Sequence, residues 1–197
     1  MKLSMPLPAT PRVTGRHVDT QRVLQARAIV RDARSGGPCG SVEQLKHWLQ
    51  PEAIMVDVDA WDRRRALEMA AAHIGQAHGL DPAPIFRALW RREQVGSTGI
   101  GHGVAIPHAR IAGIARPLTL FIRTKLAMPF DAPDGKPVSK ILVMLVPVDG
   151  NPEEHLQLLA LVARMFSDST LRARLGEAAN AEEVAAVFGQ WQGELPA

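Results

Sequence analysis

One stretch of the chain, between Ser139 and Phe166, decides the fold class. It reads SKILVMLVPVDGNPEEHLQLLALVARMF. The apolar run at its start has the length of a strand and lacks alternating polar residues, which is typical of a strand buried on both faces. Asn151 and Pro152 then open a segment with the apolar spacing of a helix. A buried strand that leads into an amphipathic helix predicts an α/β protein.

The same alternation of strands and helices extends over most of the chain. Turn and capping residues predict helices that begin near Ser41, Asp62, Asp81, Asp168 and Ala181, and strands at Ile54–Val58, Leu118–Thr124 and Ser139–Val146. The helix from Asp62 is expected to end at Gly79. We therefore expect helices that cover a mostly buried sheet.

Charge divides the chain into a basic extension and a nearly neutral body. The 197 residues carry a formal net charge of +3. Residues 1–40 hold seven basic and two acidic residues and end in a linker at Ser35–Pro38. We expect a flexible N-terminal extension at 1–40, one domain at 41–190 and a short tail at 191–197. A docking role for the extension stays open, but nucleic acid is not an expected partner because the extension has no aromatic residue for base stacking.

Composition also points to a compartment. Cys39 is the single cysteine, so no intrachain disulfide can form. No apolar run reaches the roughly 18 residues of a membrane span, and prolines interrupt any signal-peptide core near the start. We expect a cytoplasmic protein without a membrane segment.

The residues that carry chemistry follow the predicted helix at Asp81. A glycine-rich segment, Gly96–Gly103, leads into the apolar run Val104–Ile106 and then into Pro107 and His108. Glycine lets backbone N–H groups converge on an anion, and proline fixes the backbone before the imidazole. We expect a strand that ends at His108, beside a phosphate cradle made by Gly96, Ser97, Thr98, Gly99, Gly101, His102 and Gly103.

This arrangement suits the relay of a phosphoryl group. A neutral imidazole is a nucleophile near physiological pH, so His108 is the candidate phosphoryl acceptor. Arg92 offers a cationic clamp for the transferred group. His155 lies in the first turn of a predicted helix, where anions are favoured, and is the second candidate histidine.

These residues also allow other interpretations. The segment matches neither GxxxxGK[ST] nor GxGxxG, so no nucleotide signature is present. His102 and His108 could ligate a metal, but no cysteine or HExxH partner accompanies them, and neither a metal nor an organic cofactor is expected. A histidine that follows proline is also often only structural. From the residues alone, catalysis stays one of several alternatives.

The run from Glu93 to Ala109 resembles the active-site signature of the type-2 IIA domains of the bacterial phosphotransferase system, the mannitol/fructose class. The constrained positions of that signature fall on Glu93, Ile100, Gly101, Val104, Ala105, Ile106, Pro107, His108 and Ala109. The fuller string REQVGSTGIGHGVAIPH is most similar to the nitrogen-regulatory branch. The chain departs from the family where His102 replaces a frequent asparagine, where Ala109 replaces a frequent glycine, and in residues 1–40.

The resemblance implies a fold, a site and partners. It implies an α/β fold in which helices flank a mixed sheet on both faces, with His108 as phosphoryl acceptor, His155 as second histidine and Arg92 as the family arginine. It implies a phosphohistidine relay protein, rather than a conventional turnover enzyme, that takes phosphate from an HPr/NPr-like carrier and signals nitrogen, carbon or potassium status to downstream regulatory target proteins. A stand-alone sugar IIA component and an interaction module without phosphotransfer are the alternatives.

Overall fold

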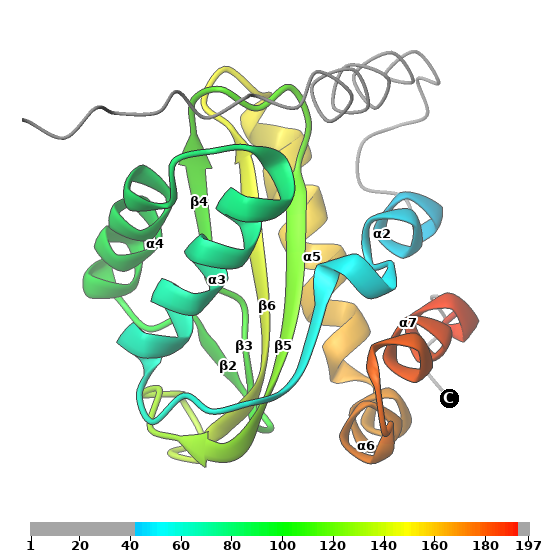
Figure 1. Ribbon diagram of the computed structural model, residues 1–197. Helices are drawn as coiled ribbons and strands as arrows, with labels where there is room; N and C mark the ends of the chain where they lie inside the picture. The colour runs from blue at the N-terminus through cyan, green and yellow to red at the C-terminus, as the bar shows by residue number, and fades with distance from the viewer. Residues whose placement is uncertain (1–41, 193–197) are drawn as a thin grey trace, which may run out of the picture. The chain divides into compact units, whose positions relative to one another are not determined.

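The protein is built on one six-stranded sheet. The computed structural model describes residues 42–192, so the expected extension at 1–40 and the last five residues of the tail lie outside it. The strands are β1 (Ile54–Val58), β2 (Gly99–Gly101), β3 (Val104–Ala105), β4 (His108–Ile111), β5 (Leu118–Met128) and β6 (Val138–Pro147). Their order is β1-β5-β6-β3-β2, and β4 also pairs with β6 (Figure 1). Parallel and antiparallel pairs both occur, which confirms a mixed sheet.

Helices cover both faces of this sheet, as the sequence predicts. They are α2 (Val42–Trp48), α3 (Arg63–His78), α4 (Pro82–Val95), α5 (Pro152–Ser167), α6 (Ser169–Glu177) and α7 (Ala181–Gln190), with a short 3₁₀ turn η1 at Pro51–Ala53. Helices α3 and α4 pack on one face, and α2, α5, α6 and α7 contribute to the core on the other (Figure 1). Two apolar cores, one on each side of the sheet, therefore stabilise the fold.

Strand β6 separates the two cores. Ile141, Val143 and Leu145 pack into the α3–α4 core, whereas Leu142, Met144 and Val146 pack into the other. Successive side chains of a strand point to opposite faces, so an unbroken apolar run serves both cores.

Capping residues fix where the helices begin. The side chains of Asp62, Asp81, Asn151, Asp168 and Asn180 each accept a hydrogen bond from a backbone N–H of the following turn. Gly79 ends α3 with a left-handed φ of 67°, a conformation that suits glycine. These contacts confirm the helix starts predicted at Asp62, Asp81, Asn151, Asp168 and Ala181, whereas Ser41 lies outside the described residues.

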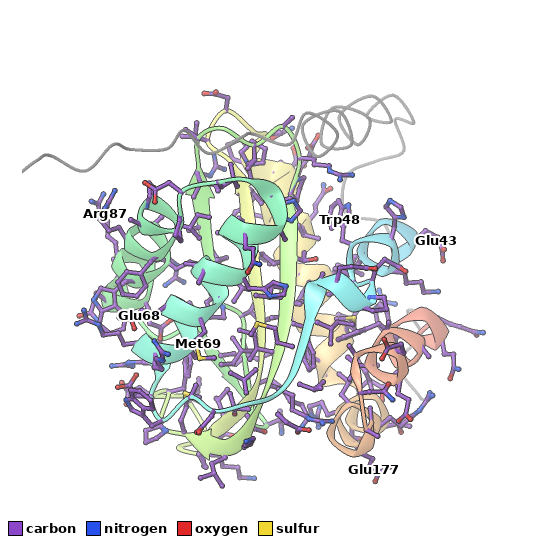
Figure 2. All side chains as sticks on the ribbon, viewed as in Figure 1. Glu43, Trp48, Glu68, Met69, Arg87 and Glu177 are labelled. Carbon is purple, nitrogen blue, oxygen red and sulfur yellow. The ribbon has the colours of Figure 1, made fainter. Side chains whose placement is uncertain are left out.

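Helix α4 has one unusual position on its buried face. Ile85 and Leu89 are buried there at a spacing of four residues, while Arg87 points outward from the helix (Figure 2). The next position of the buried stripe is Glu93, which is only 3% exposed. A charged residue thus continues an apolar stripe.

The structure corrects the expected strand at Val104–His108. Strand β3 stops at Ala105, and His108 begins the separate strand β4. Pro107 has no N–H to donate to a ladder, which interrupts the pairing with β6. Both halves nevertheless pair in parallel with β6, Val104 opposite Lys140 and His108 opposite Met144. Part of the expected glycine-rich loop, Gly99–Gly101, is strand β2.

None of the helices between residues 42 and 192 combines the length and apolar character that a membrane crossing requires.

Candidate functional site

His108 is held at both ring nitrogens. Its Nδ1 lies 2.9 Å from the Ile106 carbonyl oxygen, and its Nε2 lies 3.1 Å from Nε of Arg92. A carbonyl oxygen only accepts and an arginine Nε only donates, so Nδ1 must carry the proton and Nε2 must present its lone pair. The two contacts select one neutral tautomer of His108.

The surroundings of His108 favour the neutral form of its ring. Burial lowers the pKa of His108 below its ordinary value near 6.5, the hydrogen bond to the Ile106 carbonyl opposes this, and the charge of Arg92 lowers it further. Because a neutral imidazole is nucleophilic, the lowered pKa extends the pH range in which Nε2 can attack an electrophile.

Arg92 comes from α4 and reaches the start of β4 at the edge of the sheet. Besides its contact with His108, its Nη1 donates to the Gly96 carbonyl at 2.9 Å. One guanidinium therefore bridges the end of α4 and the imidazole, and it lies where it could contact an anion on Nε2.

His155 faces His108 from the first turn of α5. The two ring centroids are 5.5 Å apart and the rings are tilted by 54°. Burial, His108 and Arg110 lower the pKa of His155 in that order of importance. Its Nδ1 is buried without a hydrogen-bond partner in the described structure, so the ring has unused capacity beside His108.

Sequence reasoning missed a second arginine near the site. Arg110 lies two positions after His108 on β4, and its Nη1 donates to the carbonyls of Val148 and Gly150 at 3.4 and 3.3 Å. Residues two apart on a strand share a face, which is the signal that could have identified it. Arg110 adds positive charge beside His155.

The glycine-rich segment is divided between different tasks. The Ser97 hydroxyl donates to the Phe130 carbonyl and accepts from Gly99 N–H, and the Thr98 hydroxyl donates to Glu93. His102, with a left-handed φ of 55°, donates its N–H to Asp134. These hydroxyl groups and this N–H are already engaged within the protein.

The far end of that segment lies away from His108. Val104 pairs four residues earlier on β6 than His108 does, which corresponds to about 13 Å along the strand. The structure thus brings Arg92, His108 and His155 together and leaves Gly101, His102 and Gly103 at a distance. Among residues 42–192, no group of three or more histidine, cysteine, aspartate or glutamate side chains could hold a metal ion.

Comparison with known proteins adds the family. The sequence model described as "Phosphoenolpyruvate-dependent sugar phosphotransferase system, EIIA 2" matches residues 47–191. The chain belongs to this family. The nitrogen regulatory protein of Pseudomonas aeruginosa is 38% identical to this type-2 EIIA chain over 140 residues, which cover 71% of the chain and 90% of the relative.

Solved structures of EIIA proteins agree in fold. The nitrogen regulatory protein IIA-Ntr of Neisseria meningitidis superposes with a TM-score of 0.69 at 40% identity, covering 74% of this chain and 99% of that one. The IIA mannitol protein of Escherichia coli superposes with a TM-score of 0.59 at 17% identity, covering 70% and 96%, and shows the fold alone. The predicted family, its nitrogen-regulatory likeness and the fold class are confirmed.

Proposed function

We propose that this type-2 EIIA protein accepts a phosphoryl group on Nε2 of His108 from a phosphorylated HPr/NPr-like carrier, in the cytoplasm. The observation that carries the proposal is the pair of contacts that leaves Nδ1 protonated and Nε2 unprotonated, with its lone pair directed at Nε of Arg92. That arrangement presents a nucleophile and a cation at the same point.

The transfer step follows from these atoms. The Nε2 lone pair attacks phosphorus, a new P–N bond forms, and the P–N bond of the carrier's phosphohistidine breaks with its electron pair returning to the carrier's imidazole. Arg92 turns its donors from Nε2 to the phosphoryl oxygens, which neutralises their charge. His155, 5.5 Å away between ring centroids, donates to the same oxygens.

Exposed apolar side chains give the carrier a surface on which to dock. Val95 is 83% exposed at the end of the helix that carries Arg92, Leu156 is 64% exposed next to His155, and Val148 is 49% exposed where Arg110 binds its carbonyl. Apolar groups exposed around a polar centre favour a protein contact.

The phosphorylated and free forms then differ in local charge by about −1.5 to −2 near pH 7. We propose that downstream regulatory proteins distinguish the two forms through this charge. The likeness to nitrogen regulatory proteins supports control of nitrogen, carbon or potassium metabolism over the alternative of a stand-alone sugar component.

Labelling tests the proposal directly. We expect the protein, incubated with phosphoenolpyruvate, enzyme I and the carrier, to gain one acid-labile phosphate, and His108→Ala to gain none. His102→Ala is the matched control, because His102 lies at the far turn, and it should label like the parent. Full labelling of His108→Ala would refute the assignment. If the phosphorylated parent donates efficiently to a sugar IIB protein, the sugar alternative replaces the regulatory one.

A further inference from the structure

Next to Arg92 on α4, Glu93 carries a buried carboxylate that does not contact His108. Glu93 is 3% exposed, and its two oxygens accept from the Thr98 N–H at 3.2 and 3.3 Å and from the Thr98 hydroxyl at 2.5 Å. The cation nearest to Glu93, Arg63, is 3.9 Å away and also pairs with Asp131. Burying a carboxylate is costly, and an apolar residue would continue the α4 stripe at this position, so the Glu93–Thr98 contact needs a reason beyond packing.

One reason is visible on the Nδ1 side of His108. The Thr98 carbonyl accepts from the Ile106 N–H at 2.9 Å. The Ile106 carbonyl in turn accepts from Nδ1 of His108 at 2.9 Å. Three hydrogen-bonded steps therefore connect the Glu93 carboxylate to the imidazole, and the middle step holds Ile106, the residue whose carbonyl selects the tautomer.

A second connection reaches the Nε2 side. Arg92 precedes Glu93 on α4, and its Nη1 donates to the carbonyl of Gly96, two residues before Thr98. Since Glu93 ties Thr98 back onto α4, it also fixes the short segment that orients Arg92. The contacts at both ring nitrogens of His108, with Ile106 and with Arg92, thus depend on the buried Glu93–Thr98 pair.

We propose that Glu93 and Thr98 act as positioning residues that hold His108 in its Nδ1–H tautomer and Arg92 against Nε2. The inference rests on the proposed phosphoryl acceptance by His108. Neither side chain contacts the reacting atoms, so their effect passes through Ile106 and Arg92.

The test uses the full-length protein and two readouts. Glu93→Gln keeps the shape of the side chain but replaces the carboxylate, whose oxygens accept from the Thr98 N–H and hydroxyl, with a neutral amide. Thr98→Val removes only the hydroxyl. We expect each to lower the first-order rate of His108 phosphorylation about tenfold at saturating carrier, with the half-saturating carrier concentration unchanged. Thr98→Ser, which retains the hydroxyl, should restore most of the rate.

Thr124→Val is the matched control for a lost buried hydroxyl. Thr124 is 4% exposed, and its hydroxyl donates to the Leu126 carbonyl at 2.8 Å. It lies toward the end of β5 that is farther from His108. We expect it to phosphorylate at the parent rate. If Thr124→Val slows the reaction as much as Thr98→Val does, general destabilisation explains the effect and the proposal is overturned.

Nitrogen-15 NMR of the unphosphorylated His108 ring gives the second readout. The parent should show a protonated Nδ1 and an unprotonated Nε2, and Glu93→Gln should show averaging toward a tautomer mixture. An unchanged tautomer in Glu93→Gln overturns the positioning role, whatever the phosphorylation rate. Because this measurement needs no carrier, it decides the inference even if the parent accepts no phosphate, a result that would instead refute the proposed function.

Discussion

At the scale of single residues, Arg92 holds His108 by the shape of its guanidinium as well as by its charge. It donates from Nε to His108 and from Nη1 to the Gly96 carbonyl. Lysine keeps the charge but lacks the planar fork that makes both contacts. We predict that Arg92→Lys lowers the phosphorylation rate of His108 roughly tenfold, equivalent to about 1.4 kcal/mol in the barrier. Arg91→Lys, on the exposed neighbouring position, should retain the parent rate in the same assay; equal losses in both variants would contradict the prediction.

The sequence identified those candidate site residues that lie within or beside one continuous signature. Arg92 and His108 are separated by 16 residues and fall within or beside one motif. Arg110 was missed because no motif marks it and only its place on β4 brings it near the histidines. Glu93 was noted as a signature position, but its burial against Thr98 depends on the turn between α4 and β2, which the pattern does not specify.

At the scale of elements, the start of α5 determines where His155 lies. The Asn151 side chain caps this helix by accepting from Glu153 N–H at 2.9 Å, and His155 lies about one turn after Asn151. We predict that Asn151→Ala lowers the free energy of unfolding by about 1 kcal/mol, and that it also slows phosphorylation by loosening this turn. Urea unfolding and initial labelling rates measure the two effects.

Asn180→Ala supplies the comparison for that element. Asn180 caps α7 in the same way, accepting from Glu183 N–H at 2.9 Å, on a helix that carries no site residue. It should lose similar stability and keep the parent rate. If the two variants phosphorylate equally fast, the cap of α5 does not position His155.

Helix starts were predictable because capping is a local interaction among neighbouring residues. The break in the strand expected at Val104–His108 was not predictable in this way. The apolar run continues up to Pro107, whereas the ladder with β6 is broken between Ala105 and His108. The strand expected at Leu118–Thr124 was too short, because β5 continues to Met128. Such boundaries depend on pairing partners that are distant in sequence.

At the scale of the whole molecule, the layered α/β architecture followed from composition and periodicity, but the strand order did not. Placing β6 between β5 and the β3–β4 edge requires long-range pairings that no local pattern encodes. That central position shapes the candidate site, because β6 fixes His108 opposite Met144 and then leads into the helix that carries His155. The two histidines meet because one strand supports the first and its connection places the second.

The whole molecule should also lose stability in mild acid because of its histidines. The pKa values of His78, His108 and His155 are lowered, in each case mainly by burial, from an ordinary value near 6.5. As the pH falls below 6.5, the unfolded chain takes up protons on these rings before the folded protein does, so unfolding becomes more favourable. We predict a lower urea midpoint at pH 5.5 than at pH 7.5, and a smaller decrease between these pH values in the double variant His108→Gln, His155→Gln. An equal pH dependence in parent and double variant would show that these two rings do not govern acid stability, and a midpoint that rises in acid would contradict the lowered pKa values.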